Sequence, residues 1–352
     1  MNYKETLDRI HSTDPALLKG CQENWNKVAK PLHSLGLLEG LVAKIGAAQG
    51  TVHPDIAKRK VLVFCADNGV VAEGVSQSAS AVTTAVARSM AVGSSNVNVF
   101  AGQAGAGVAV YDVGMIDDVP GLGQCKVCRG TRNLAKEPAM SREESIAAIE
   151  AGIHAAEKAK EEGCKLLVTG EMGIGNTTTA AAVLSVLTRT EPEAVCGRGS
   201  GLSDAGFKRK IQVVRKGIAT NCPCPEDPVD VIAKVGGADI AAMCGVFLAG
   251  AALQVPVVMD GLISCVAALA AARIDNRTIE YMIPSHTGRE PGGRLALEAL
   301  GLKAPIQADL ALGEGTGGLL LLPMLDMALA LYNSSHSFTD IGIEPYREQE
   351  GV

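Results

Sequence analysis

Aromatic residues are scarce in this chain of 352 residues, which has one Trp, five Tyr and five Phe. Proteins that bind single-stranded nucleic acid stack the bases on aromatic side chains. The scarcity of aromatics, together with the lack of a Lys/Arg run, therefore excludes a nucleic-acid partner from our expectations. With 32 basic and 38 acidic residues, the formal net charge is −6. We expect a compact soluble protein that acts on a small ligand.

Long uninterrupted apolar segments are also lacking. Residues 1–8 are polar and do not resemble the apolar core of a signal peptide. The longest apolar stretch, residues 240–259, is interrupted by Gln254 and Pro256. These interruptions favour a buried helix over residues 240–253 and a buried strand over residues 255–260, not a membrane span. We predict a cytoplasmic protein with no membrane partner.

The ten cysteines form no strong metal-binding motif. Several lie in apolar runs, where a reduced cysteine packs as a small hydrophobe. The closely spaced pairs are Cys125 with Cys128 and Cys222 with Cys224, and neither pair has a neighbouring His. A four-thiolate zinc site is one interpretation, but the second spacing is short for it. We predict no metal and no cofactor.

Short apolar runs alternate with longer alanine-rich segments from residue 60 onward. The runs cover residues 60–67, 108–114, 165–171, 255–260 and 280–285. Continuous apolar character is typical of strands that are buried on both faces. Strands that alternate with helices form right-handed βαβ units, so the pattern predicts an α/β fold with a parallel sheet. Ligands of such sheets bind beyond the carboxyl ends of the strands.

The two ends of the chain differ from this middle part and carry no strong strand signal. Residues 33–48 show an apolar helical face, and a last helix is predicted over residues 316–332. We expect residues 1–55 and 316–352 to pack together as a small helical lobe. Residues 56–315 would then form the catalytic domain.

A first glycine cluster, Gly170–Ala182, follows a predicted strand and opens a predicted helix. Glycines allow close approach of a ligand, and the N–H groups at a helix start favour an anion. The cluster lacks the Gly-Lys-Ser/Thr of a nucleoside-triphosphate loop, and Thr178 stands where a dinucleotide fingerprint has its third glycine. A tight turn capped by threonines is the structural alternative to an anion site. The candidate ligand-binding residues are Gly173, Gly175, Asn176 and Thr177.

A second glycine cluster, Gly197–Lys210, precedes another helix, whose first turn we expect to be basic. Cations there oppose the helix dipole, a small cost that an anionic ligand would offset. A solvated basic face is the alternative interpretation. Gly199 and Lys210 are the candidates, and we expect Lys210 to be a surface cation that contributes little to stability.

The third glycine cluster, Leu312–Gly318, places one carboxylate, that of Glu314, among glycines and before the apolar run 319–322. Apolar surroundings would raise the pKa of this carboxyl, as a general base working near neutral pH requires. A partner of the helix dipole is the alternative role.

Taken together, these clusters resemble the nicotinate-nucleotide:dimethylbenzimidazole phosphoribosyltransferases, which activate the lower ligand of cobalamin and related cobamides. The matching segments are Ala66–Ser76, Gly170–Thr178, Gly197–Lys210, Gly236–Asp239, Asp260–Gly261, Pro284–His286 and Leu312–Gly317. The resemblance implies a Rossmann-like parallel-sheet domain with helices on both faces and a small helical lobe from both termini. It also implies a dimer with active sites near the interface.

The resemblance further implies a reaction. An aromatic base or phenol attacks C1′ of nicotinate mononucleotide, nicotinate leaves, and an α-ribotide forms for assembly of the cobamide nucleotide loop. The family's general base matches Glu314, and Glu171 matches a second carboxylate of the acceptor pocket. The further substrate-binding residues that we carry over are Gly173, Gly199, Lys210, Ser80, Leu312 and Gly313.

Several positions depart from the family pattern. Asn68 replaces a His, Gly288 a Ser, Gly293 a His and Ala311 an Arg, and the segment Gln77–Ala81 lacks a Pro-Gln pair. Loss of a Ser and an Arg near a phosphate removes charge-assisted hydrogen bonds worth roughly 1.5–3 kcal/mol each.

Three hypotheses follow from this pattern. The first is an active phosphoribosyltransferase, working as a homodimer or as a heterodimer with a paralogue. The second is a weakly active or non-catalytic structural subunit that supports a catalytic paralogue. A nicotinamide-dependent oxidoreductase is third, because no complete dinucleotide fingerprint is present.

Overall fold

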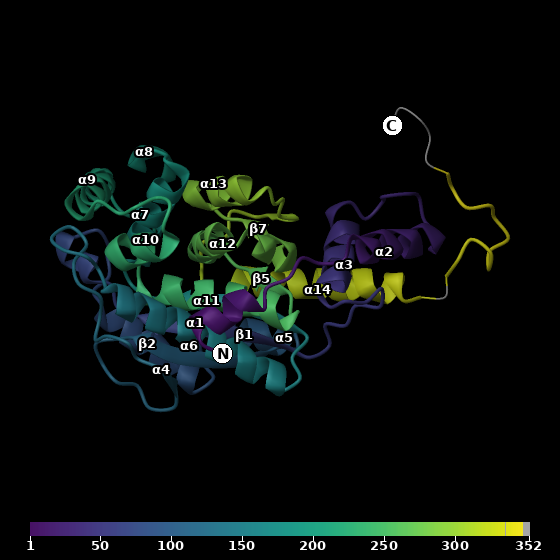
Figure 1. Ribbon diagram of the computed structural model, residues 1–352, viewed down its shortest axis with the longest axis horizontal. Coiled ribbons are helices and arrows are strands. Elements are labelled where there is room, and N and C mark those ends of the chain that lie inside the picture. The colour runs from purple at the N-terminus through teal and green to yellow at the C-terminus, as the bar shows by residue number, and fades with distance from the viewer. Residues whose placement is uncertain (335, 348–352) are drawn as a thin grey trace.

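Six parallel strands form the central sheet of the computed structural model, which describes residues 1–334 and 336–347 (Figure 1). Their order across the sheet is β3-β2-β1-β4-β5-β6. The bounds are β1 Arg59–Ala66, β2 Gly107–Gly114, β3 Gly123–Gln124, β4 Leu166–Met172, β5 Val257–Met259 and β6 Met282–Pro284. A small second sheet pairs β7 (His286–Thr287) with β8 (Ile306–Gln307). The parallel α/β fold predicted from the apolar runs is confirmed.

Both faces of the central sheet are covered by helices, because successive strand residues point into two different cores. Leu62 and Phe64 of β1 belong to one hydrophobic core, and Val61 and Val63 belong to the other. The first core includes α6 (Arg142–Glu161), α11 (Ala238–Leu253) and α12 (Leu262–Ile274). The second includes α3 (Leu37–Ala48), α4 (Ala81–Ala91), α5 (Asn96–Gln103) and α14 (Thr316–Tyr332).

The helices α6 and α11 cross so closely that glycine is required on each of them. A Cβ at Gly152 would lie 1.8 Å from the carbonyl oxygen of Ala242, and a Cβ at Gly245 would lie 1.9 Å from that of Ile149. Helix α11 is buried over nearly its whole length, which agrees with the helix predicted over residues 240–253. Within the described residues, no helix is long and apolar enough to cross a membrane.

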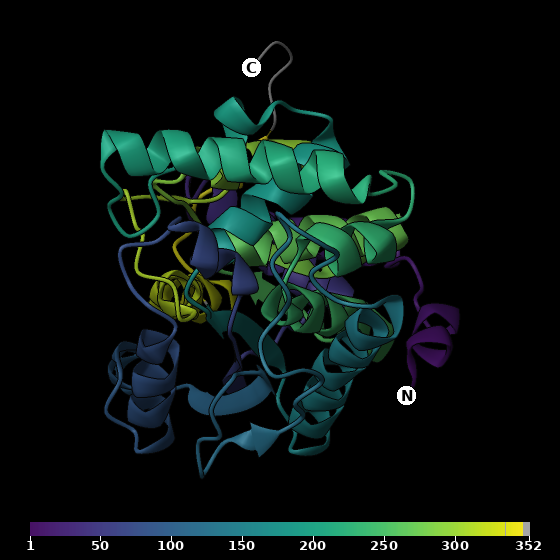
Figure 2. The same cartoon turned by 90° about the vertical axis from the view of Figure 1, so that its left-hand side faces the viewer.

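A further group of helices lies beyond the layer formed by α6, α11 and α12. They are α7 (Asn176–Thr188), α8 (Pro192–Val195), α9 (Asp204–Asn221), α10 (Pro228–Val235) and α13 (Pro291–Leu300). Figure 2 shows the long helix α9 on the outer side of this group, and α9 packs against α7, α8 and α10. Two 3₁₀ helices, η1 (Gly69–Glu73) and η2 (Asn276–Tyr281), precede α4 and β6.

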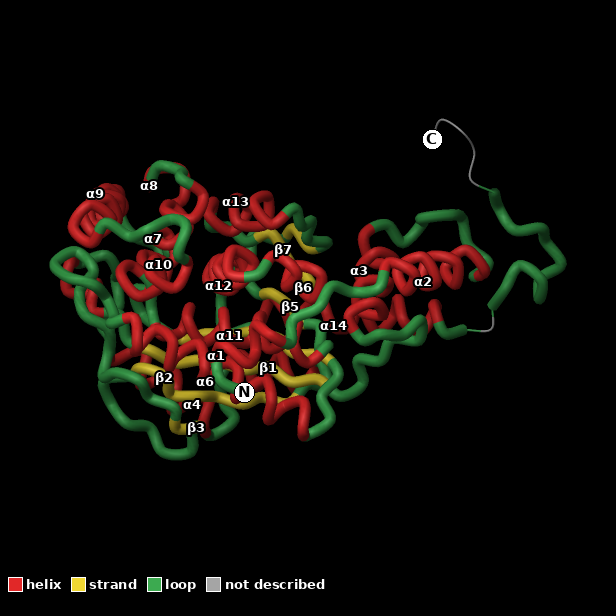
Figure 3. Tube along the Cα trace, in the orientation of Figure 1, coloured by secondary structure: helices red, strands yellow, loops and turns green. Residues whose placement is uncertain are grey.

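A helical extension projects from the sheet body and contains α2 (Pro15–Lys27), α3 and the end of α14 (Figures 1 and 3). The rings of Trp25 and Tyr332 meet edge to face with centroids 4.9 Å apart, which joins the two ends of the chain. The first helix, α1 (Tyr3–Asp8), lies instead against α6 and α11, where the amino group of Met1 is 2.7 Å from Glu157. Division into units of residues 1–55 with 316–352 and 56–315 remains a prediction, but α1 packs on the sheet body.

Candidate active site

A cavity of about 300 Å³ lies beyond the carboxyl ends of β4, β5 and β6. Its walls come from the ends of these strands and from the glycine-rich loops that precede α7, α9 and α14. The strand order changes direction between β1 and β4, and open α/β sheets bind ligands outside the strand ends near such a point. The cavity is therefore where the predicted parallel sheet would place a ligand.

Nine of the predicted site residues line this cavity. They are Glu171, Gly173, Gly175, Asn176, Thr177, Gly199, Leu312, Gly313 and Glu314. Ser80 and Lys210 do not line it. Ser80 is the N-cap residue of α4, and the residues that this part of the chain contributes to the wall are Val75, Ser76 and Val86.

The turn between β4 and α7 brings the backbone close to the cavity. Gly175 is the N-cap residue of α7 and adopts a left-handed conformation with φ of 93°, so glycine and not a threonine occupies the cap. Gly173 is packed so tightly that a Cβ there would lie 2.6 Å from the carbonyl oxygen of Ala66. The first turn of α7 thus faces the cavity without a capping side chain, as an anion site requires.

Lys210 is a buried cation, so the prediction of a surface lysine is wrong. Helix α9 begins at Asp204 with Ser203 as its cap, which places residues 208–210 in the second turn and an acidic residue in the first. The Lys210 side chain is fully buried, and Nζ donates to Thr177 Oγ1 at 2.9 Å and to the Gly197 carbonyl at 3.0 Å. Burial lowers the pKa of this ammonium group. Lys210 therefore supports the cavity wall from behind.

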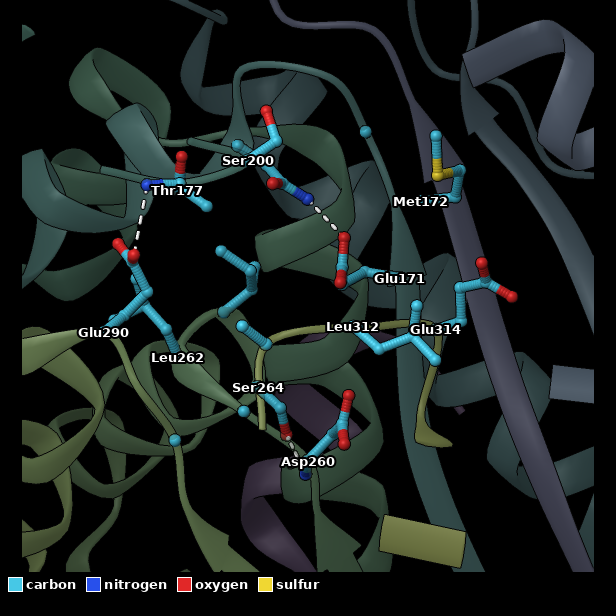
Figure 4. Close-up of a pocket in the computed structure, with 18 of the residues that line it drawn as sticks. Glu171, Met172, Thr177, Ser200, Asp260, Leu262, Ser264, Glu290, Leu312 and Glu314 are labelled. Carbon is cyan, nitrogen blue, oxygen red and sulfur yellow. Dashed lines mark hydrogen bonds between the residues drawn. The ribbon is translucent and has the colours of Figure 1, made fainter. Parts of the chain in front are cut away.

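Glu314 lines the cavity, but its carboxylate is held by the start of α5. Oε1 accepts a hydrogen bond from Asn96 Nδ2 at 2.9 Å, and Oε2 accepts one from the Val97 N–H at 3.1 Å. In Figure 4 the carboxylate points away from that of Glu171. The prediction of apolar surroundings for this carboxylate is wrong, because its oxygens contact the polar N-terminus of α5.

Glu171 ends β4 and faces the cavity from the opposite side to Glu290 (Figure 4). Its Oε2 accepts a hydrogen bond from Asn176 Nδ2, and a Cβ at Gly313 would lie 2.6 Å from its Oε1. Glycine at position 313 therefore leaves room for this carboxyl. Burial, reinforced by the negative charge of Asp239, raises the pKa of Glu171 to about 8.

Asp260 is a cavity residue that was not among the predicted site residues. Its Oδ2 accepts a hydrogen bond from the Gly315 N–H at 3.0 Å, and its Oδ1 accepts one from the Gly318 N–H at 3.1 Å. The carboxylate thereby binds the N-terminus of α14 and fixes the loop that carries Glu314. Its position at the end of a predicted strand was a signal that could have identified it.

Glu290 is a second unpredicted residue of the wall, and it lies against the second glycine cluster. Its Oε1 accepts a hydrogen bond from the Gly199 N–H at 3.0 Å. Its Oε2 is buried and has no hydrogen-bond partner among the described residues. A Cβ at Gly197 would lie 2.0 Å from Oε2, so the carboxylate rests directly on the glycine backbone. No pattern in the sequence marked Glu290, because its contacts are about 90 residues away in the chain.

Two of the positions that depart from the family pattern, Gly288 and Ala311, also line the cavity. Arg198 is the only arginine or lysine that lines it among the described residues. Its guanidinium group donates to the Leu202 carbonyl at 2.9 Å and pairs with Asp204 at 2.5 Å. Arg198 is therefore already engaged with its own loop.

Comparison with known proteins assigns the chain and its fold to a family. A family model described as "Phosphoribosyltransferase" matches residues 10–343. The nicotinate-nucleotide–dimethylbenzimidazole phosphoribosyltransferase of Acetivibrio thermocellus is 43% identical over 349 residues, which cover 99% of this chain and 96% of that protein. The chain belongs to this phosphoribosyltransferase family.

Further members of the phosphoribosyltransferase family agree in sequence and in structure. The protein of the same name from Ruminiclostridium cellulolyticum is 42% identical, and the matched region covers 99% of this chain and 100% of that protein. The crystal structure of CobT from Thermus thermophilus is 40% identical and superposes with a TM-score of 0.89. The superposed region covers 94% of this chain and 100% of the Thermus thermophilus chain. The similarity thus spans both the sheet body and most of the helical extension.

Proposed function

We propose that the chain transfers the ribose phosphate of nicotinate mononucleotide to an aromatic base or phenol and forms an α-ribotide for cobamide assembly. The observation that carries this proposal is the placement of Glu314 and Glu171 on glycine-rich loops around one cavity at the strand ends. The relatives that are about 40% identical over the full length are named for this transfer to dimethylbenzimidazole. The family match favours an active enzyme over a structural subunit that only supports a paralogue.

The chemistry needs a base and a positioned donor but no acid for the leaving group. The acceptor nitrogen or oxygen forms a bond to C1′ while the bond from C1′ to the pyridinium nitrogen breaks. The bonding electrons return to the ring, so nicotinate leaves without being protonated. The acceptor's proton passes to Glu314, whose carboxylate is oriented by the Asn96 amide and the Val97 N–H.

The phosphate of the donor fits the glycine turn at the start of α7 and the loop at Gly199. The N–H groups of a helix start attract an anion, and the buried ammonium of Lys210 lies behind this wall. The Glu290 carboxylate accepts the hydrogen bond of the Gly199 N–H in this structure. We infer that Glu290 is an internal anion that leaves this N–H when the phosphate binds.

The direct test uses the purified chain without any partner protein. It is incubated with nicotinate mononucleotide and a panel of benzimidazoles, purines and phenols, and products are detected by mass. Formation of an α-ribotide by the chain alone is expected. Absence of both product and donor binding from the folded chain would overturn the proposal in favour of the structural-subunit alternative.

We further propose that the chain forms a homodimer through α5 and α14, which pack against each other beside the cavity. Val99 on α5 is 61% exposed, and Leu320 and Met327 on α14 are 40% and 73% exposed. Large exposed apolar side chains on two helices that pack against each other favour a protein interface. Light scattering should give a dimer for the chain and a monomer for Met327→Asp. A monomeric wild-type chain, or one that dimerises only with a paralogue, would contradict this proposal.

We place the reaction in the cytoplasm, because all ten cysteines, which lie in the described part of the chain, are free thiols. Two of them, Cys222 and Cys224, are exposed. Exposed free thiols persist in a reducing compartment and oxidise elsewhere.

A further inference from the structure

Two carboxyl groups share one amide at the candidate active-site cavity, that of Glu171 facing the cavity and that of Asp239 fully buried. Asn176, the first residue of α7, donates from Nδ2 both to Glu171 Oε2 and to Asp239 Oδ2, the latter at 3.0 Å. A side-chain amide nitrogen carries two protons, so both are used.

Asp239 has no direct access to the cavity. It lies in the first turn of α11, is fully buried, and does not line the cavity wall. Its Oδ1 accepts a hydrogen bond from the Ile240 N–H at 3.0 Å, and its Oδ2 is taken by Asn176. Asp239 therefore does not contact bound substrate, and its charge acts on the neighbouring Glu171 carboxyl.

The groups around Glu171 set its protonation. Burial is the largest cause of its raised pKa of about 8, and the charges of Asp239 and Asp260 act in the same direction. The hydrogen bond from Asn176 and one from the backbone of Glu314 act in the opposite direction. Cys65 on β1 also faces this group, and burial keeps the pKa of its thiol well above its usual value, so it adds no charge.

The contacts of Asp239 favour its ionised form, because it lies in the first turn of α11 and accepts hydrogen bonds from the Ile240 N–H and from Asn176. Burial raises its pKa to about 6, below that of Glu171. Two interacting carboxyl groups that cannot both ionise divide their protons in this way. Two carboxyl groups that share one amide disfavour ionisation of both, and the start of α11 at Asp239 favours the proton on the carboxyl that faces the cavity.

The negative charge of the cavity wall links the protonation of Glu171 to substrate binding. Its walls contain the carboxyl groups of Glu171, Asp260, Glu290 and Glu314, and Arg198 is the one arginine or lysine that the described residues contribute to them. The donor of the proposed function carries both a phosphate and a carboxylate, so each ionised wall carboxyl opposes its entry.

We propose that Asp239 is a positioning residue whose negative charge keeps the Glu171 carboxyl protonated, while Asn176 holds the two groups beside each other, so that the anionic ribotide enters a cavity with one negative charge fewer. The inference rests on the proposed function, because it names an anionic donor. It assigns Asn176 to the support of Glu171 and not to direct contact with the ribotide. Donor binding should then weaken as pH rises and Glu171 ionises.

The test is calorimetric binding of nicotinate mononucleotide between pH 6 and 9.5 to the full-length wild-type chain and to two variants. Asp239→Asn removes the like charge, so Glu171 should ionise at lower pH and the loss of affinity should begin roughly one pH unit lower. Asn176→Ala removes a hydrogen bond that favours the ionised form, so the loss should begin at higher pH. A merely structural role would weaken binding without moving these profiles in opposite directions.

A matched control is Asp112→Asn, which changes another fully buried carboxylate, on β2, that accepts a hydrogen bond from the Met115 N–H at 3.0 Å. Its profile should coincide with that of the wild type. Wild-type profiles that are flat across this range, or variant profiles that do not shift, would overturn the inference while leaving the proposed function intact. No donor binding at any pH would instead overturn the proposed function.

Discussion

Replacement of Lys210 by Ala should destabilise the protein, although a lysine near a helix start would ordinarily be dispensable. The side chain is fully buried and donates two hydrogen bonds, to Thr177 Oγ1 and to the Gly197 carbonyl. Lys210→Ala leaves these two acceptors without a donor, which costs about 1–3 kcal/mol for a buried unsatisfied group. It also leaves a cavity in place of the lysine stem. Relief of the buried charge offsets part of this loss, which leaves a net destabilisation of about 2–4 kcal/mol.

Thermal unfolding followed by calorimetry measures this effect. At about 2 °C per kcal/mol for a chain of this size, the Tm of Lys210→Ala should fall by roughly 4–8 °C. Lys208→Ala, which removes an exposed cation from the same turn, is the control and should leave the Tm within about 1 °C. Equal Tm values for the two variants would refute the buried network around Lys210.

The pH dependence of stability gives an independent check on Lys210. Burial lowers its pKa in the folded state, whereas in the unfolded chain it titrates near the usual value of about 10.4. Between these two values the unfolded state binds more protons, so this site makes the folded state more stable as pH rises. Lys210→Met keeps most of the side-chain volume without the charge, and its stability should lack this alkaline gain. A parallel pH dependence in the two proteins would contradict the assignment.

Two other substitutions test the packing and the cavity. Gly152→Ala should lower the free energy of unfolding by about 1–3 kcal/mol, because its Cβ would lie 1.8 Å from the Ala242 carbonyl oxygen on the facing helix. Urea unfolding checks this, with Gly40→Ala, where no atom lies within 4 Å of the new Cβ, as the control. Glu290→Gln should lower the KM for nicotinate mononucleotide on the order of tenfold, because it removes a negative charge from the Gly199 N–H. Glu298→Gln on the exposed face of α13 should leave KM unchanged, and equal KM values for both variants would rule out Glu290 as an internal anion.

The sheet could be predicted from the sequence because its strands are buried on both faces. The runs predicted at residues 60–67 and 165–171 correspond to β1 (Arg59–Ala66) and β4 (Leu166–Met172), and the predicted last helix has the bounds of α14. The strands β3, β7 and β8 contain two residues each, which is too short to show any periodicity.

The contacts of the charged site residues could not be predicted, because they join distant parts of the chain. Glu314 binds Asn96, which lies 218 residues away, and Asn176 binds Asp239. Lysine is usually exposed, so the sequence favoured a surface position for Lys210, and tertiary pairing with the Gly197 carbonyl overrides that tendency. The glycine clusters predicted loops that line the cavity, whereas side-chain direction within those loops depends on the assembled fold.

The assignment of Glu314 as the general base is the central claim, and its most direct test is the turnover of Glu314→Gln. Glutamine keeps the size of the side chain and can still accept from the Val97 N–H, but it cannot take the acceptor's proton. The value of kcat should fall by about 10²–10⁴-fold while donor affinity is retained, and a phenol should suffer more than an azole because its hydroxyl must lose a proton to react. Asn96→Ala, which removes a carboxylate partner but leaves the base, should retain much of the activity. Near-normal turnover by Glu314→Gln would contradict the account and leave Glu171 as the next candidate for the base.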